Sequence, residues 1–312
     1  MLYSYTFCFA LVALSLYGGA EGQIVEATTI ASYGTFKFLV KLDLLFAVKT
    51  AKVYFTYTSC GGTIIGWDWI LTSAHCFFDM ETEVQGRKVK AKWKRVMVTA
   101  GVKFVNGSNG QIQSIKRSDG RVWLHPEAAP PKKDVALIKL KESLNPSSTV
   151  ATAWFLKTPM DYDFKKKIRE EGGVDCILQG WGNTDIKYNP TLKMYEWTGI
   201  SQLAREGKFP LYQYSNGIFY ITNGRGKFPK AAPGDSGSPV VCAPSKRVER
   251  DGHVTYERQD VHEHGMVYGV LSGGDCFGIN TLDKNCKDPE YAVDVRVVND
   301  WIEKTKSDHD EP

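Results

Sequence analysis

The sequence has little excess charge of either sign. Its 312 residues carry 39 Lys and Arg against 35 Asp and Glu, which leaves a formal net charge of +4. A charge this weak argues against nucleic acid as the main partner. The sequence also has no internal repeat and no group of histidines and cysteines with the spacing of metal ligands. We therefore expect no nucleic-acid partner, no metal and no cofactor.

Long hydrophobic runs are missing beyond the N-terminus. The early apolar run from Phe7 to Leu16 is too short to span a bilayer comfortably, and the small residues Gly18, Gly19 and Ala20 follow it. This order is typical of a secretory signal peptide, which we predict over residues 1–22; a buried N-terminal strand or helix is the alternative. We expect a soluble protein that is secreted to the extracellular space and does not contact the membrane.

Cysteine is sparse but even in number after the signal peptide. Cys8 would leave with that peptide, and six cysteines remain: Cys60, Cys76, Cys176, Cys242, Cys276 and Cys286. Cysteines pair in an oxidising compartment. The sequon Asn106-Gly107-Ser108 predicts glycosylation at Asn106. Both features agree with secretion.

Short stretches in which apolar and polar residues alternate recur between turn residues, for example at 35–42, 96–98 and 267–271. This pattern predicts half-buried strands in antiparallel barrels or sandwiches. A helix is clear only near the C-terminus, where Val298, Trp301 and Ile302 fall on one face. The turn-rich stretch 144–148 predicts a break between two strand-dense halves.

Three motifs supply a histidine, an aspartate and a serine in that order. His75 lies in Leu71–Cys76, Asp134 begins a short apolar run, and Ser236 lies in Pro233–Pro239. A serine hydroxyl becomes a useful nucleophile when a histidine removes its proton and a buried carboxylate holds that histidine in the correct tautomer. Taken without the other motifs, Asp134 would be interpreted as a capping carboxylate at the start of a strand, and His75 as a histidine of the core. Subtilisins and α/β-hydrolases use the same chemistry in other orders.

The chain resembles trypsin/chymotrypsin-type serine proteases from about residue 24 to about residue 305. The matching motifs are Cys60-Gly61-Gly62-Thr63-Ile64-Ile65, Thr72-Ser73-Ala74-His75-Cys76, His125-Pro126, Asp134–Leu140, Gly180-Trp181-Gly182 and the Ser236 run. The resemblance implies an all-β fold of two antiparallel six-stranded β-barrels with the active site in the cleft between them. Within a protease domain at 23–312, the barrels would occupy about 24–145 and about 146–296, before a C-terminal helix at about 297–306.

The resemblance also implies catalytic roles. Ser236 would be the nucleophile and His75 the general base and then general acid, while Asp134 would orient the imidazole and stabilise its charged form. The backbone N–H groups of Gly234 and Ser236 would form the oxyanion hole.

Two disulfides follow from the resemblance, Cys60–Cys76 and Cys176–Cys242. The family's bridge beside the nucleophile is missing, because Ala232 occupies one of its two positions. We therefore predict that Cys276 pairs with Cys286; two free thiols are the alternative.

The specificity pocket departs from the trypsin pattern. Lys230 stands at its base, where trypsin-like members have aspartate, and Glu290 aligns with a glycine of the pocket wall. An unpaired Lys230 would favour acidic side chains, whereas a Lys230–Glu290 pair would leave a neutral and shallow floor. Ser272 would lie on the strand that pairs with the substrate backbone, and Gly274 would keep the pocket mouth open. We expect weak or absent cleavage after Arg and Lys.

Activation is also expected to be unusual. Family members are made as zymogens, and a new N-terminus pairs with the aspartate before the nucleophile, here Asp235. Ile24 is the candidate N-terminus, with Val25 as the alternative. Gln23 precedes it in place of Arg or Lys, so an aminopeptidase or a non-tryptic activator would be needed.

We therefore predict a secreted monomeric serine endopeptidase that acts on protein or peptide substrates and is a target of protein inhibitors. The alternative is a protease-like binding protein, or an unactivated homologue, without turnover. The basic stretch 87–95 is interpreted as a solvated surface strand with its charges mostly on one side, and a polyanion-binding patch is the alternative.

Overall fold

The structure is a computed structural model of the whole chain. It describes residues 29–30, 36–49, 53–84, 86–102, 110–155, 174–183, 185–189, 194–198, 201, 203–221, 231–243, 246–250, 253–257, 260–261, 265–274 and 290–310.

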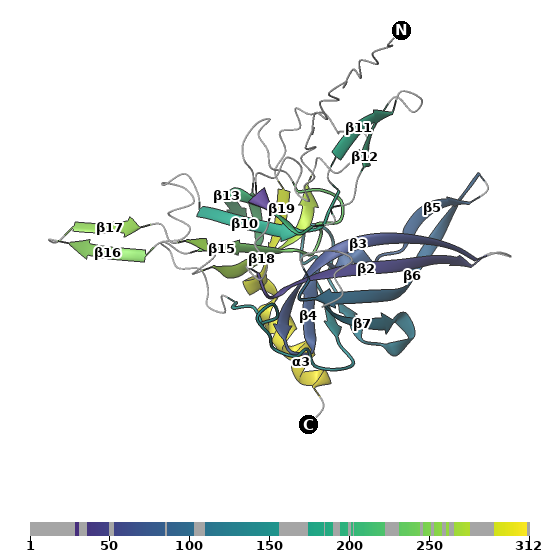
Figure 1. Cartoon of the computed structure of the whole chain (residues 1–312), viewed down its shortest axis with the longest axis horizontal. Helices are drawn as coiled ribbons and strands as arrows, with labels where there is room; N and C mark the ends of the chain where they lie inside the picture. Colours follow the sequence, from purple (N-terminus) through teal and green to yellow (C-terminus); the bar gives the residue numbers. More distant parts are fainter. Residues whose placement is uncertain are drawn as a thin grey trace, which may run out of the picture.

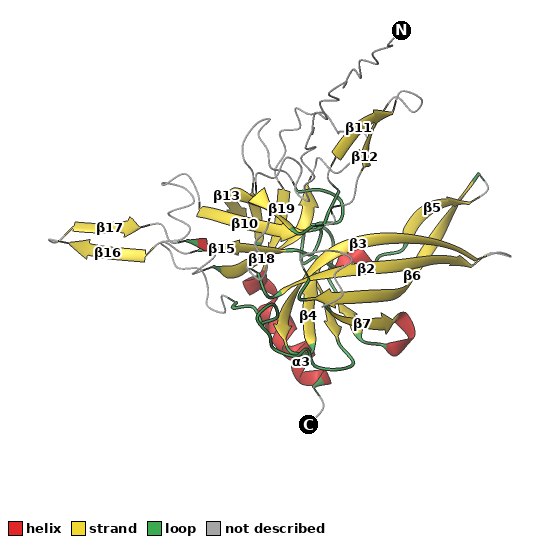
Figure 2. Cartoon of the chain, in the orientation of Figure 1, coloured by secondary structure: helices red, strands yellow, loops and turns green. Residues whose placement is uncertain are grey.

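The chain forms two curled antiparallel sheets and a C-terminal helix (Figures 1 and 2), so the expected fold class is confirmed. The strands of the first sheet are β2 (Leu39–Lys49), β3 (Val53–Gly66), β4 (Trp69–Thr72), β5 (Met80–Val84), β6 (Arg87–Ala100), β7 (Gln111–Lys116), β8 (Val122–Leu124) and β9 (Ala136–Lys139). Those of the second sheet are β1 (Thr29–Ile30), β10 (Val174–Gly180), β13 (Arg205–Ser215), β14 (Ile218–Ile221), β15 (Pro239–Cys242), β18 (Met266–Gly274) and β19 (Glu290–Asp294). The hairpins β11 (Asp185–Asn189)–β12 (Met194–Thr198) and β16 (Lys246–Arg250)–β17 (His253–Glu257) form separate two-stranded sheets.

The second sheet closes on itself. Its order is β13-β10-β15-β18-β19-β14, and β14 pairs again with β13, which gives a ring of six strands. The two-residue strand β1 adds to the outside of this ring by pairing with β13. Residues 29–30 therefore belong to the second sheet, whereas the first barrel was expected to begin at about residue 24.

The first sheet has eight strands, more than the six expected, because two long hairpins extend it. Strands β2 and β3 pair continuously from Leu39↔Thr63 to Lys49↔Val53, and β5 adds to the outer part of β6. Alternate residues of β2 belong to one buried cluster, namely Val40, Leu42, Leu44, Phe46 and Val48. This alternation places one face of the sheet on the core of the first half.

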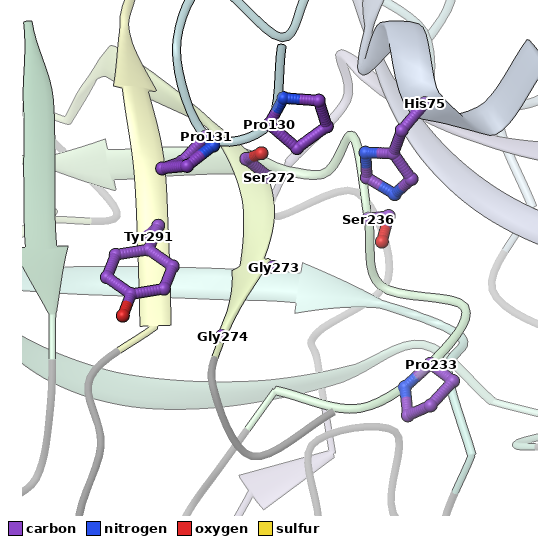
Figure 3. Close-up of a pocket in the computed structure, with 9 residues that line it drawn as sticks. All are labelled: His75, Pro130, Pro131, Pro233, Ser236, Ser272, Gly273, Gly274 and Tyr291. Carbon is purple, nitrogen blue, oxygen red and sulfur yellow. The ribbon is translucent and has the colours of Figure 1, made fainter. Parts of the chain in front are cut away.

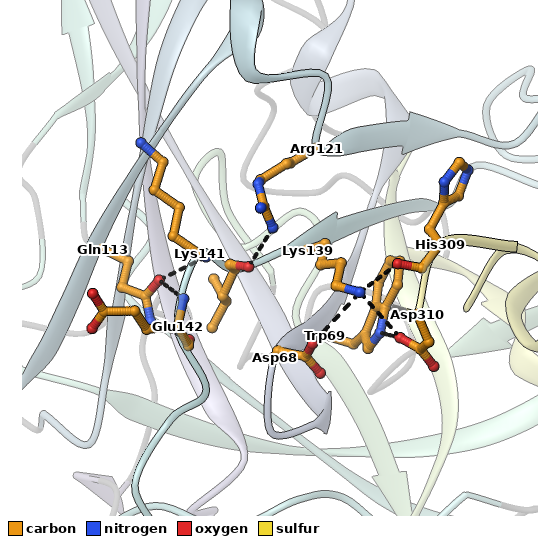
Figure 4. Close-up of polar contacts among 10 residues, drawn as sticks. Asp68, Trp69, Gln113, Arg121, Lys139, Lys141, Glu142, His309 and Asp310 are labelled. Carbon is orange, nitrogen blue, oxygen red and sulfur yellow. Dashed lines mark hydrogen bonds and ion pairs between the residues drawn. The ribbon is translucent and has the colours of Figure 1, made fainter. Parts of the chain in front are cut away.

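The side chains of two glutamines cover the outer edge of β7. Gln113 accepts the N–H groups of Lys141 and Glu142 over 3.0 and 3.1 Å, and it donates to the Glu142 carbonyl over 2.6 Å (Figure 4). Gln111 accepts from and donates to the backbone of Asn145, both over 2.7 Å. These five hydrogen bonds join the edge strand β7 to the segment 141–145, which does not pair with β7 as a strand.

The segment after β9 connects the two halves. A bridge between Ser147 and Val150 forms the turn predicted near 144–148. The chain then runs along the first sheet, where Ala153 donates to the Ile64 carbonyl over 2.8 Å. Phe155 next bridges to Val267 of β18 in the second sheet.

Helix α3 (Asn299–His309) follows a 3₁₀ turn at Val295–Val298 and returns to the first sheet. Its Ile302 packs in a cluster that includes residues of both sheets. Just beyond the helix, the Asp310 carboxylate accepts the Trp69 indole N–H over 2.7 Å, and Lys139 lies 3.3 Å from the same oxygen (Figure 4). No helix among the described residues is long and apolar enough to cross a membrane.

Candidate active site

His75 and Asp134 are joined by two hydrogen bonds. His75 lies in the 3₁₀ turn Ala74–Phe77, which the Cys60–Cys76 disulfide ties to β3. Its Nδ1 atom lies 2.6 Å from Asp134 Oδ2, and its backbone N–H donates to Oδ1 over 2.9 Å. The Asp134 side chain is completely buried. An ionised carboxylate only accepts hydrogen bonds, so this geometry places the proton on Nδ1 and leaves Nε2 as a proton acceptor.

Ser272 completes the hydrogen bonding of Asp134. Its hydroxyl donates to Oδ2 over 2.5 Å, from β18 of the second sheet. Sequence reasoning assigned Ser272 to the specificity pocket, and it does line the same cavity as His75. Its bond to Asp134 was not predicted.

Ser236 lies in a tight turn between the sheets. Asp235 donates its backbone N–H to Ala232, and Ser238 donates to Asp235, over 2.9 and 3.0 Å. Gly234 and Gly237 have φ values of +103° and +84°, in the region that favours glycine, so these two positions explain the glycines of the motif. The carbonyl of Ser236 accepts the N–H of Gly61 over 2.7 Å, which ties the turn to β3.

A cavity of about 530 Å³ contains both His75 and Ser236 (Figure 3). The two side chains stand next to one another on one side, and Tyr291 of β19 lies on the other. The remaining lining residues are Pro130, Pro131, Pro233, Ser272, Gly273 and Gly274. The cavity is therefore walled by residues of both halves of the chain.

Asp235, beside the nucleophile candidate, is buried with its carboxylate held by the backbone. The N–H groups of Gly182 and Ala232 each donate to it over 2.9 Å. A Cβ atom at position 182 would lie 2.6 Å from this carboxylate, which explains the second glycine of Gly180-Trp181-Gly182. Ile24, its predicted partner after activation, lies outside the described residues.

The pocket residues are only partly described. Glu290 is buried, and its carboxylate accepts the N–H of Ala231 over 3.3 Å. Its neighbour Tyr291 lines the cavity, as does Gly274, which was expected at the pocket mouth. Lys230 lies outside the described residues, so the two alternatives for the pocket floor stay predictions.

The second predicted disulfide, Cys176–Cys242, is present and joins facing residues of β10 and β15. The predicted Cys276–Cys286 pair, the glycosylation site Asn106 and the signal peptide at 1–22 fall outside the described residues.

Sequence reasoning missed two hydroxyl groups near the nucleophile turn, of which the first connects the two sheets and the second joins β4 to β3 within the first sheet. Ser73 donates to the Leu271 carbonyl over 2.7 Å, and the N–H of Gly237 donates to the same carbonyl over 2.7 Å. Thr72 donates to the Gly61 carbonyl over 2.7 Å. Their only sequence signal is their place just before His75, in a motif that was read for its histidine.

Known proteins match most of the chain. A family model described as Trypsin matches residues 47–302. Complement factor I of Mus musculus is 29% identical over 256 residues, which are 78% of this chain and 34% of that protein, so the chain spans about a third of it. Trypsin of Sus scrofa is 25% identical over 253 residues, 79% of this chain and 84% of that protein. Chymotrypsin-like elastase family member 3B of Homo sapiens is 25% identical over 267 residues, 81% and 80% of the two chains.

Proposed function

Since this chain belongs to the trypsin family of serine proteases, we propose that it is a secreted endopeptidase that hydrolyses peptide bonds through an acyl-enzyme on Ser236. The observation that carries the proposal is the pair of bonds from His75 to Asp134, on the wall of the cavity that also contains Ser236. This arrangement supplies a nucleophile, a base of defined tautomer and room for a peptide.

In the first half of the reaction, the Ser236 hydroxyl attacks the scissile carbonyl carbon and gives its proton to His75 Nε2. The tetrahedral intermediate places negative charge on the former carbonyl oxygen, toward the N–H groups of Gly234 and Ser236. As the C–N bond breaks, the proton passes from His75 to the leaving amine, and the acyl group remains on Ser236. Asp134 stabilises the imidazolium at both stages.

In the second half, water replaces the amine. His75 removes a proton from the water as its oxygen attacks the acyl carbon, and the second intermediate collapses by breaking the bond to Ser236. The proton returns to the Ser236 oxygen, and the carboxylic acid product leaves. The enzyme is restored without any cofactor.

Four further proposals concern the setting of this reaction. The two disulfides support export to an oxidising compartment. Activation proceeds by exposure of Ile24 and its pairing with Asp235, and the protein acts as a monomer. Specificity is non-tryptic, because Lys230 stands in the sequence where trypsin-like members have the aspartate that binds Arg and Lys, and neither an unpaired lysine nor a Lys230–Glu290 pair would replace that aspartate.

The test is covalent labelling of protein trimmed to begin at Ile24. A fluorophosphonate probe should modify Ser236 of the wild-type protein, identified by mass spectrometry of the peptide, and should leave Ser236→Ala unlabelled. A peptide library should be cleaved by the same protein, with Arg and Lys disfavoured before the scissile bond. Absence of both labelling and cleavage would refute the enzyme, and efficient turnover of an arginine anilide would refute the specificity.

A binding protein without turnover is the second candidate. Two observations favour it. The identity to the proteases is only 25–29%, and Gln23 and Lys230 differ from the residues that trypsin-like members have before the new N-terminus and at the pocket base. It predicts that the trimmed protein stays silent toward the probe while a peptide or protein still binds in the cavity.

A further inference from the structure

Strand β6 turns a row of cations to solvent. Along its outer half, Ala91 and Trp93 are buried and the lysines between and beside them are exposed. Leu45 of β2 pairs with Arg95 and Phe46 pairs with Trp93, so Lys94 is an extra residue in a bulge. The bulge turns Lys94 and Arg95 to the same side and returns Val96 to the core.

These cations have few acidic neighbours. Within the described part of the chain, no carboxylate forms a salt bridge with Lys90, Lys92, Lys94 or Arg95. Glu81 of β5 faces Lys90, and Asp43 of β2 faces Met97 and forms an ion pair with Lys41, whereas Lys92 faces Ala47 and Arg95 faces Lys116 of β7. Like charges placed opposite one another are unfavourable in a sheet, and a bound anion would relieve that repulsion.

The same face continues into an exposed apolar pair. Met97, two residues beyond Arg95, is 39% exposed, and Ile112 of β7 is 57% exposed. Met97 pairs with Ser114, so Ile112 is its diagonal neighbour at about 7–8 Å. We define the basic–apolar face by these residues: Lys90, Lys92, Lys94, Arg95, Met97 and Ile112.

The apolar end of this face lies toward the candidate active site. One cross-strand row runs from Gly61 of β3 through Lys41 and Thr99 to Ile112. Three strand spacings make this row about 14 Å long, and Gly61 donates to the Ser236 carbonyl. Lys41 and Thr99 are buried, so the exposed face begins at Ile112, at the far end of this row from Gly61.

We propose that the basic–apolar face is a docking site for an acidic segment of the protein substrate. Carboxylates of the segment contact Lys90, Lys92 and Lys94, and an apolar side chain packs on Met97 and Ile112. This inference deepens the proposed function, because the segment belongs to the protein that is cleaved. Binding there would hold the substrate near Ser236 and raise its local concentration.

The chemistry of the face selects this occupant. Alternate residues of an extended peptide repeat at about 6.6–6.8 Å, the spacing of Lys90 and Lys92 themselves. A sulfated polysaccharide would match the cations but would leave Met97 and Ile112 without an apolar partner. Single-stranded nucleic acid needs aromatic stacking surfaces, and the aromatic residue of this strand, Trp93, is buried.

The binding test uses the full chain carrying Ser236→Ala, so that it does not depend on turnover. The probe is a fluorescein-labelled peptide of about ten residues, about 33 Å when extended, with Glu at alternate positions and Phe at one end. Fluorescence anisotropy should show binding that weakens steeply as salt is added. A peptide with Gln in place of Glu should bind at least tenfold more weakly.

Two double variants locate the site. Lys90→Gln with Lys92→Gln should weaken binding about tenfold, whereas Lys208→Gln with Lys304→Gln, an equal charge change at exposed sites elsewhere, should change it less than twofold. Met97→Ser with Ile112→Ser should weaken binding of the Phe-containing peptide about tenfold. The same double variant should hardly change binding of a peptide with Ala in place of Phe. In the wild-type background, the face variants should leave cleavage of a short uncharged peptide unchanged.

The outcomes separate this inference from the proposed function. Binding with the expected variant pattern, in wild-type protein trimmed to Ile24 that cleaves nothing, would support the face as an acidic-peptide site but refute both the enzyme and the substrate as the occupant of the face. Cleavage of short uncharged peptides, without binding of the acidic peptide, would support the enzyme and refute the docking face. Heparin binding that depends on Lys90 and Lys92, with no effect of Met97 and Ile112 on the acidic peptide, would overturn the proposal in favour of a polyanion.

Discussion

The Ser272 hydroxyl lies 2.5 Å from Asp134 Oδ2 and donates a hydrogen bond to it. Ser272 belongs to β18 in the second sheet, and Asp134 lies just before β9 in the first. One oxygen of the carboxylate therefore meets both His75 and the opposite half of the molecule. The position of His75 depends on how the two halves meet, as well as on its own turn.

Replacement of Ser272 by Ala should lower kcat about 10- to 100-fold, because a hydrogen bond to a charged group contributes about 1.5–3 kcal/mol. KM for a short peptide should change little, since Asp134 acts through His75. Ser272→Thr keeps the hydroxyl and should restore most of the rate. Equal losses in the Ala and Thr variants would show that shape at this position, rather than the hydrogen bond, matters.

Asp134→Asn should lower kcat on the order of 10⁴-fold, the size typical of a histidine held in the wrong tautomer. The amide donates toward Nδ1 and drives the proton to Nε2, which then cannot accept from Ser236. Steady-state kinetics and thermal unfolding should be measured together. Asp308→Asn, which changes an exposed carboxylate on α3, is the matched control and should keep full activity.

The Cys60–Cys76 disulfide should contribute about 3 kcal/mol to the free energy of unfolding in the chain-entropy model, and Cys176–Cys242 about 4 kcal/mol. The difference follows from sequence separations of 16 and 66 residues. Denaturant unfolding of the two double Cys→Ser variants checks the order. A larger loss for the Cys60 and Cys76 pair would show that native-state strain or packing outweighs loop closure.

His125 predicts an acid-sensitive contribution to stability. Burial, followed by repulsion from Lys133, lowers its pKa below the usual 6.5. The unfolded chain therefore takes up a proton before the folded one does, and the stability present above pH 6.5 is lost as the pH falls through the folded-state pKa. Urea midpoints should fall more in the wild type than in His125→Asn, and equal falls would contradict this assignment.

The sequence predicted the parts of the site that are local in the chain. His75, Asp134 and Ser236 each lie in a short motif, and the glycines at 234 and 237 follow from backbone angles that such a turn requires. The Ser272–Asp134 bond joins residues 138 positions apart. Ser272 was expected only to line the pocket. Its bond to Asp134 could not be predicted, because no local sequence pattern indicates where its hydroxyl points.

The extensions of the first sheet were harder to predict. The alternation in 35–42 indicated a strand, but the length of β2 depends on its pairing with β3 and β6. The basic stretch 87–95 was correctly expected to have charges mostly on one side. Its bulge at Lys94, which turns two cations outward together, depends on the partner strand and cannot be read from β6 alone.

The contacts of Asp310 with Trp69 and of Lys139 with His309, at the end of α3, have a consequence for biosynthesis. The carbonyl that Lys139 binds lies 170 residues further along the chain. At about 5–20 residues per second, a ribosome needs roughly 10–30 s to make that stretch. During this interval, Trp69 of the newly made first sheet lacks its hydrogen-bond partner Asp310. A chaperone that recognises exposed aromatic surface could therefore bind the first sheet before the helix is made.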